Sequence, residues 1–585
     1  MINLADLQLW QPPWNTNGSA SLIRVSSSAL KNVTGSCAVE KVAKAYVGLY
    51  TEARDWSQRK DPRAVFLLGA ARTVLAAQRT PANLAEVIAA ELGADATEPS
   101  LLAAKTMVQN ALNATEDFAA EDLAVDQVMQ PTADFVCVAT TDNQRLELTS
   151  WGVFYQSVDR TIRELRLFCY RDAQTARDKN QLIAAVNILL NGAITDGPIA
   201  RWTEPHQTLP TNPPLRVRVR QIGCLDSSAA TLFDGDASSA AAFVGGISTI
   251  VQDFLLAPEF QPGNNCVECR FRISCPAIVK IPGFLGLPTT GKISKSLSRS
   301  MLSSYQRCNY QYFLTYVLKL PKKAFESNAA IDRGNAVHEW IMKAHQREQA
   351  CTAADLPAGQ LGEVAEILGW PITYLDQARN WITSHFAVCP YQHSDTKLES
   401  EQSKTVWDSD ADVVITTRAD ELGTRAGVPI WRELKTTAVI QELTANEYLL
   451  LYPQVAFAIC IQEEVGGFVE LELLTPESGK LISFDVADAS IVLAARRSIA
   501  INFDQLHHDE SFAANPGTAC LSCPVSAWCD QRVTNPQTTT EKLADGLEVD
   551  LITGEVITTQ PVPIDALARA LALVEAVDAG DDLPF

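Results

Sequence analysis

Three polar residues in the second half of the chain have types and spacing suited to metal-assisted chemistry. The β-branched run Val413–Asp420 ends in a carboxylate, and a second run carries Glu433-Leu-Lys435. Alternate residues of a strand point to the same face, so Glu433 and Lys435 should project together. We predict that a Gly-rich turn, Gly423–Gly427, folds the two runs into a hairpin that brings Asp420 beside them.

These residues offer the donors of a divalent metal site. Carboxylate oxygens are hard ligands for Mg²⁺ or Mn²⁺, and such an ion lowers the pKa of a bound water and stabilises charge on a phosphate. Lys435 can orient that water and neutralise developing charge. His338, on a predicted helix around Arg333–Trp340, would add a ligand. The predicted metal ligands are therefore His338, Asp420 and Glu433, and Lys435 joins them as a catalytic residue.

Eight of the fourteen cysteines form two matched patterns. Cys37 and Cys308 are followed, 229 and 212 residues later, by triplets with C-x2-C-x5-C spacing. The triplets are Cys266, Cys269 and Cys275 in the first half and Cys520, Cys523 and Cys529 in the second. Four thiolates suit a tetrahedral zinc ion or an iron–sulfur cluster, and spacing alone does not separate the two. A bound metal would tie the first helix of each half to its last segment.

The other six cysteines lie in mostly apolar contexts and are interpreted as reduced core thiols. They are Cys137, Cys169, Cys224, Cys351, Cys389 and Cys460.

The matched cysteine intervals predict a tandem duplication of one domain. We expect residues 1–280 and 281–533 to be the two copies, with a Gly- and Pro-rich boundary near Ile281–Gly291. Residues 534–577 should hold a linker, a hairpin and a helix, and residues 578–585 an acidic tip.

The second half resembles the iron–sulfur, RecB-like branch of the PD-(D/E)XK nucleases. Gly334-x-x-x-His338, Asp420 and Glu433-x-Lys435 follow the family order. One cysteine before the core and three after it bracket the nuclease core as in AddB-type helicase-nucleases and CRISPR-adaptation nucleases. The resemblance implies an α/β fold of two tandem restriction-endonuclease-like domains. Each would have a mixed central sheet flanked by helices and closed by four cysteines around a [4Fe–4S] cluster, giving two clusters in all.

The family also places a Q-x-x-x-Y helix near the DNA and the active site. This chain keeps Gln454 but has Ala458 where the tyrosine is expected. The resemblance implies that Gln454 is a site residue, and Tyr452 or Phe457 could replace the missing tyrosine.

The first half has the features of a degenerate copy. Thr73 stands at the histidine position of Gly69-x-x-x-Thr73, and Glu164-Leu-Arg166 resembles Glu433-Leu-Lys435. Trp151 lies where the aspartate would be. Without the aspartate, lysine and histidine, this half should hold Mg²⁺ poorly, so we predict a non-catalytic DNA-binding or structural domain.

The chain ends in a sequence that resembles the acidic tips of bacterial single-stranded DNA-binding proteins. A terminal Phe can fill an apolar pocket while acidic residues meet a basic rim. The predicted contact residues are Asp581, Asp582, Leu583, Pro584 and Phe585. The resemblance implies docking onto replication or repair proteins; the alternative is a frayed, solvated terminus.

Composition and charge restrict the classes of protein to which the chain could belong. The formal net charge is −21, yet residues 291–324 carry seven Lys or Arg and no Asp or Glu, so DNA binding would be local. No apolar run is long enough for a membrane span, and the start lacks a secretory pattern. We therefore expect a cytoplasmic protein of a bacterium or of a phage-infected host, with no membrane partner.

Two functions fit these features. The first is a metal-dependent DNA nuclease, specifically an exonuclease, that acts on single strands or ends in recombination, repair or defence. The second is a non-catalytic single-stranded DNA-binding protein built on nuclease folds, with the acidic tip as a recruiter. No Walker A sequence is evident, so any helicase activity would come from a partner.

Overall fold

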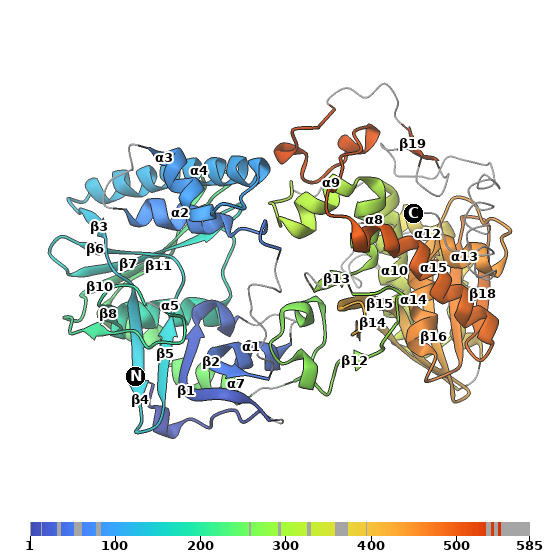
Figure 1. Ribbon diagram of the computed structural model, residues 1–585, viewed down its shortest axis with the longest axis horizontal. Coiled ribbons are helices and arrows are strands. Elements are labelled where there is room, and N and C mark those ends of the chain that lie inside the picture. Colours follow the sequence, from blue (N-terminus) through green and yellow to red (C-terminus); the bar gives the residue numbers. More distant parts are fainter. Residues whose placement is uncertain are drawn as a thin grey trace. The chain divides into compact units, whose positions relative to one another are not determined.

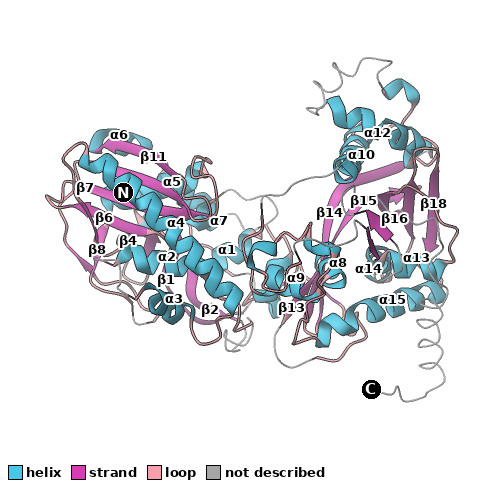
Figure 2. Ribbon diagram, turned by 90° about the horizontal axis from the view of Figure 1, so that it is seen from above, coloured by secondary structure: helices cyan, strands magenta, loops and turns pink. Residues whose placement is uncertain are grey.

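The computed structural model describes residues 2–12, 15–31, 37–51, 61–77, 83–199, 201–256, 259–289, 294–323, 329–356, 372–393, 395–533, 540–542 and 548–550. The chain divides into two compact units, Met1–Ala277 with Val317–Pro321, and Ile278–Tyr316 with Lys322–Phe585. Each unit combines mixed β-sheet with helices (Figures 1 and 2), which agrees with the predicted α/β class.

The first unit contains two sheets. One has, in spatial order, β2 (Tyr46–Tyr50), β1 (Asn17–Ser26), β5 (Arg145–Thr149), β4 (Phe135–Thr140), β8 (Ala193–Thr195) and β9 (Thr208–Leu209). The other has β11 (Ala229–Asp236), β10 (Arg216–Gly223), β7 (Ile162–Cys169), β6 (Val153–Ser157) and β3 (Met129–Pro131). The helices are α1 (Ala38–Ala45), α2 (Leu67–Ala76), α3 (Leu84–Leu92), α4 (Glu98–Leu123), α5 (Lys179–Asn191), α6 (Ala237–Phe243) and α7 (Ile247–Leu256).

A helical crossover buries the middle of the second sheet. β6 and β7 are antiparallel, and α5 then returns the chain so that β10 pairs with β7 in parallel. A parallel pair requires such a connection. Asp178 is the N-cap of α5, and its side chain accepts hydrogen bonds from the N–H groups of Asn180 and Gln181. Ile183 and Val186 of this helix join the main core of the unit.

The segment Ala237–Leu256 is long and apolar enough to cross a membrane, by length and composition only. In the structure it comprises the two helices α6 and α7, and Ala240, Val251 and Leu255 belong to the core of the first unit. The segment therefore has a packing role in this fold.

The second unit is built on one mixed sheet. Its order is β12 (Val279–Lys280), β14 (Thr396–Asp408), β15 (Val413–Arg425), β16 (Val428–Thr436), β17 (Phe468–Leu474) and β18 (Gly479–Asp485), and β13 (Lys295–Leu297) also pairs with β15. The helices are α8 (Arg299–Arg307), α9 (Asn309–Tyr312), α10 (Ala329–His345), α12 (Ile372–His385), α13 (Ala445–Leu451), α14 (Pro453–Gln462) and α15 (Ala489–His508). A satellite core unites α10 and α12 with β16 and β17, through Val337, Ile382, Leu434 and Leu474.

The hairpin predicted to carry the acidic residues is present, but its turn is shorter than predicted. β15 continues to Arg425, and Ala426 and Gly427 alone connect it to β16. Both have positive φ, 51° and 78°, as a two-residue type I′ turn requires. Gly423 lies inside β15 and not in the turn. Glycine is required at this position because a Cβ would stand 2.0 Å from the carbonyl oxygen of Lys397.

The two units share an order of elements, apart from the short strands β8 and β9 between α5 and β10 and the helix α13 between β16 and α14. In the first, the β6–β7 hairpin is followed by α5, the parallel strand β10, the antiparallel strand β11 and two helices before the cysteine triplet. In the second, the β15–β16 hairpin is followed by α14, the parallel strand β17, the antiparallel strand β18 and α15 before its triplet. β7 therefore holds the place in its unit that β16 holds in the other.

Beyond the second triplet, the predicted linker includes a strand. β19 (Thr540–Lys542) pairs antiparallel with β20 (Glu548–Asp550). The predicted helix within residues 534–577 and the predicted tip, residues 578–585, lie outside the described residues.

Candidate active site

β15 and β16 place three predicted catalytic residues in contact. Oδ2 of Asp420 accepts hydrogen bonds from the backbone N–H of Leu434 (2.6 Å) and from Nζ of Lys435 (3.3 Å). The same ammonium lies 3.5 Å from Oε2 of Glu433. The other oxygen of Glu433 accepts from the indole of Trp431 at 2.9 Å. Because the donors belong to rigid strands, the hairpin itself sets the geometry of the three side chains.

The two carboxylates have opposite pKa shifts. Burial would raise the pKa of Asp420, but Lys435 and His338 outweigh it and hold that pKa well below its usual range. Burial raises the pKa of Glu433 to about 7; the charge of Asp420 adds to this rise, and Lys435 opposes it. A nearby cation favours the charged form of a carboxyl group. The acidic pair thus has the donors and the electrostatic need that a hard divalent cation satisfies.

A third element, α10, brings His338 to the same place. Its Nδ1 lies 3.3 Å from Oδ1 of Asp420. Glu401 of β14 completes a group in which one ligand atom from each of His338, Glu401 and Asp420 lies within 4.8 Å of the others. Two of the three predicted metal ligands therefore lie together with a carboxylate that was not predicted. Glu433 lies beside Lys435, next to this group.

Glu401 has an unusual backbone. Its φ is +60°, and the β14–β15 ladder, which pairs Ser400 with Glu421 and Gln402 with Ala419, has no pair at Glu401. A positive φ is uncommon in residues other than glycine, and such conformations concentrate at functional sites. The sequence around Glu401 is a polar strand without a motif, so sequence reasoning had no signal for this residue.

Gln454, which the resemblance implies is a site residue, contacts an arginine of another helix. It is buried on α14, and its Oε1 accepts a hydrogen bond from Arg299 of α8. Its Nε2 has no hydrogen-bond partner within the described parts of the chain. Phe457 cannot replace the missing tyrosine, because it stacks on Phe284 in the core at 6.0 Å between ring centroids. Tyr452 stacks on Tyr448.

The two cysteine triplets adopt the same backbone pattern. In both, the first cysteine N–H bonds the carbonyl three residues earlier, in Gly263 and Gly517. In both, the carbonyl of the second cysteine accepts a hydrogen bond from the N–H of the residue three positions later, which is Arg272 or Ser526. The carbonyl of that residue accepts in turn from the N–H of the third cysteine. The shared turns present three thiols in each unit in the same local conformation.

The lone cysteines lie near their triplets. Burial raises the pKa of Cys266 to about 11, and the nearby thiol of Cys37 adds to this rise. Burial likewise raises the pKa of Cys523, and Cys308 adds to it. Among the residues that the structure describes, no three of these eight thiols lie within 4.8 Å of one another. The donors suit a metal cluster or ion, and the arrangement alone does not identify which.

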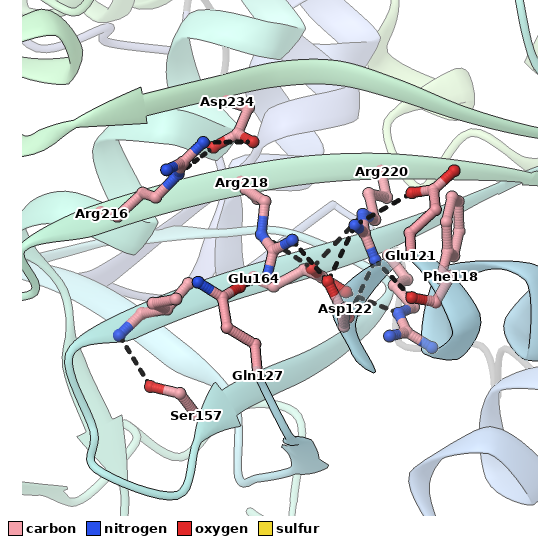
Figure 3. Close-up of polar contacts among 12 residues, drawn as sticks. Phe118, Glu121, Asp122, Gln127, Ser157, Glu164, Arg216, Arg218, Arg220 and Asp234 are labelled. Atoms are coloured by element: carbon pink, nitrogen blue, oxygen red, sulfur yellow. Dashed lines mark hydrogen bonds and ion pairs between the residues drawn. The ribbon is translucent and has the colours of Figure 1, made fainter. Parts of the chain in front are cut away.

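In the first unit, arginines surround Glu164 of β7, the strand that precedes the helical crossover as β16 does in the second unit. Glu164 of β7 is fully buried, and its ion pairs reach Arg166 (2.7 Å), Arg218 (3.3 Å) and Arg220 (3.5 Å). Figure 3 shows Arg218 and Arg220 converging on Asp122, near the end of α4, at 2.6 and 3.0 Å. On β10, Arg218 and Arg220 lie beside Glu164 and Arg166 of β7. In the second unit, the residues of β17 beside Glu433 and Lys435 are Leu471 and Leu473. The buried guanidinium groups thus supply the positive charge beside this carboxylate that a metal ion would otherwise supply.

The other predicted markers of the first unit, Thr73 and Trp151, have partners of their own. Thr73 donates to Glu91 at 2.9 Å. Trp151 packs between Phe66 and Phe168. Within the described residues of this unit, no group of three His, Cys, Asp or Glu side chains is close enough to hold a metal ion.

The interpretation of Cys351 and Cys389 as simple core thiols is incomplete. Both are buried, but each lies in a group with two buried histidines, His345 and His385. Sequence reasoning overlooked this group because its members come in two separate pairs, His345-x5-Cys351 and His385-x3-Cys389. The second pair, with its short spacing, was the available signal.

The comparisons with known proteins bear on the second unit. Residues 296–530 match the family model described as the PD-(D/E)XK nuclease superfamily, less than half of the chain. The second unit therefore contains a segment similar to a superfamily whose members are mostly nucleases that use divalent metals. A solved crystal structure, that of SSO0001, is similar to 40% of this chain over 97% of its own length, with 14% identity and a TM-score of 0.16. No curated protein matches the chain.

Proposed function

We propose that the protein is a metal-dependent deoxyribonuclease whose active site is formed by Asp420, Glu433, Lys435 and His338. The observation that carries the proposal is the contact of Lys435 with both carboxylates, at 3.3 and 3.5 Å, inside the domain that matches the nuclease superfamily. The finer assignment is an exonuclease of the RecB-like, iron–sulfur branch, acting in the cytoplasm in bacterial or phage DNA recombination, repair or defence.

The side chains have distinct tasks in this proposal. His338, Asp420 and Glu401 would hold Mg²⁺ or Mn²⁺, with Glu433 at its edge. When bound, the ion lowers the pKa of a water and stabilises charge on the scissile phosphate. Lys435 holds Asp420 and Glu433 in place and offers a proton donor to the attacked phosphate.

End-labelled single- and double-stranded DNA tests the proposal directly. In Mn²⁺, the wild-type protein should shorten the labelled strand, and Lys435→Ala should reduce the rate by roughly 10²–10³-fold while DNA binding persists. Lys480→Ala is a matched control, because Lys480 of β18 also pairs with an acid, Glu442, but lies outside the site. Equal rates for Lys435→Ala and the wild type would refute the proposal.

We further propose that the two units arose by tandem duplication and that each holds a [4Fe–4S] cluster on its four cysteines. The shared order of elements and the matching turns of the triplets support the duplication. A four-iron cluster needs a wider cage than a single ion, and the separation of the eight thiols is compatible with that. The first unit would then be a non-catalytic copy, and the acidic tip would recruit replication or repair proteins.

The alternative function is a non-catalytic single-stranded DNA-binding protein. Two observations favour it: Gln454 is hydrogen-bonded to Arg299, and in the first unit arginines surround Glu164 of β7. Binding of single-stranded DNA without any metal-dependent shortening would establish this alternative.

A further inference from the structure

Four buried side chains of the second unit come together outside the carboxylate site. His345 ends α10, Cys351 follows it, His385 ends α12, and Cys389 lies four residues further on. One ligand atom from each lies within 4.8 Å of the others, and none of the four residues is more than 3% exposed. Two imidazoles and two thiols in one dry place are the donor set of a tetrahedral zinc ion.

The hydrogen bonds of the two histidines orient them toward one another. Nδ1 of His345 contacts a carboxylate oxygen of Glu421, and Nδ1 of His385 lies 2.5 Å from Oε1 of Glu472. A carboxylate partner favours a proton on Nδ1 and leaves the Nε2 lone pair free. The two Nε2 atoms nevertheless face each other at 3.1 Å. Two lone pairs at this distance repel unless a cation or a shared proton lies between them.

The sulfur atoms approach the same point. Sγ of Cys389 lies 3.5 Å from Nε2 of His345 and accepts the backbone N–H of Cys351 at 3.4 Å. That backbone bond draws the loop carrying Cys351 against the second thiol. Four donor atoms thus lie within 4.8 Å of one another, close enough to bind one ion.

The carboxylate behind His385 is itself fixed. Glu472 accepts a hydrogen bond from Nε of Arg432 at 2.9 Å, and Arg432, buried, also reaches Glu470 at 3.3 Å. A histidine whose second ring nitrogen is held by an anchored carboxylate is the usual arrangement around protein-bound zinc, because the carboxylate sets the tautomer and the ring orientation.

We propose that His345, Cys351, His385 and Cys389 form a structural Cys2His2 zinc site. All four coordination positions would be protein side chains, which distinguishes it from a catalytic site with an open position. The ion would fasten the ends of α10 and α12 to the sheet. Since α10 also carries His338, the site would help to position the carboxylate centre. The proposal does not depend on nuclease activity.

The first test compares metal content among full-length variants purified without chelator. Cys389→Ser and His385→Gln should each lose one zinc per chain relative to the wild type, measured by elemental analysis. Cys460→Ser removes another buried thiol, on α14, and should keep the zinc of the wild type. The same zinc content in all four proteins, or loss of iron in place of zinc, would overturn the proposal.

A second test needs no variant and therefore survives a failure of the variants to fold. The zinc X-ray absorption spectrum of the wild-type protein should contain sulfur at about 2.3 Å and nitrogen at about 2.0–2.1 Å. Zinc with sulfur ligands alone, or protein without zinc, would contradict the site. So would a disulfide between Cys351 and Cys389 in peptides from anaerobically prepared protein.

Discussion

Asp420 and Glu421 are consecutive residues of β15, and each contacts a different histidine of α10. Asp420 lies 3.3 Å from His338, and Glu421 pairs with His345 two turns later on the helix. One dipeptide of the strand thus holds one helix at two points. The first contact belongs to the proposed catalytic centre and the second to the proposed zinc site.

This relationship predicts different outcomes for two neighbouring substitutions. Asp420→Asn removes a metal ligand, so Mn²⁺-dependent DNA degradation should fall below detection while thermal stability changes little. Glu421→Gln should lower the melting temperature and retain measurable cleavage, because Glu421 only positions His345. Melting curves and cleavage assays of both variants check this. An inactive, fully stable Glu421→Gln protein would place Glu421 in the chemistry itself.

Glu401→Gln tests the ligand that the sequence did not reveal. The amide keeps the size of the side chain and removes its charge, so the protein should fold normally. We expect at least a tenfold loss of apparent Mn²⁺ affinity, about the loss seen when a partner of a metal ligand is removed. A Mn²⁺ titration of the cleavage rate measures it, with Glu399→Gln of the same strand as the control. An unchanged titration would exclude Glu401 as a ligand.

Glu164→Gln should affect the stability of the first unit and leave cleavage unchanged. The substitution removes the carboxylate that pairs with Arg166 and leaves Arg218 and Arg220 with Asp122 as their main buried counter-charge. Removing one partner of a buried ion pair costs about 3–5 kcal/mol, which denaturant unfolding would register. Loss of cleavage in a variant that is still folded and binds DNA would mean that the first unit is catalytic.

Cysteine substitution separates the clusters from ordinary thiols. The anaerobically purified protein should be brown, with the broad visible absorbance of iron–sulfur charge transfer. Cys523→Ser should lose about half of the colour and the fold of the second unit, because metal binding and folding are coupled. Cys460→Ser should keep both. A colourless wild-type protein that contains stoichiometric zinc on all eight cysteines would contradict the cluster assignment.

Deletion of residues 581–585 should leave melting temperature and cleavage of naked DNA unchanged. Proteins that recognise the tips of single-stranded DNA-binding proteins should bind the full chain, and salt should weaken this binding because it screens the Asp charges. A free peptide of the last eight residues should compete. If the peptide instead binds the truncated protein, the tail is autoinhibitory; if it binds neither, it is a solvated terminus.

The sequence predicted the parts of the site that follow from strand periodicity. Asp420, Glu433 and Lys435 meet because a hairpin and the alternation of side chains dictate it. Glu401 could not be predicted, since it reaches the site through a backbone irregularity of a polar strand. The partner of Gln454 and the arginines around Glu164 depend on the packing of α8 and α4, which local pattern does not encode. The His–Cys group requires two helix ends to meet across residues that are distant in sequence.

The distribution of the cysteines along the chain has a consequence for synthesis. All four thiols of the first set, from Cys37 to Cys275, precede the end of the first compact unit at Ala277, and only Val317–Pro321 joins that unit later. Because domains emerge and fold in order from the ribosome, the first set is complete when barely half of the protein exists. The second set is complete only after Cys529 has been synthesised. With the proposed cluster on each set, iron and sulfide delivery would be needed at two separate moments for each chain, and a cell short of iron would accumulate protein loaded in its first half alone.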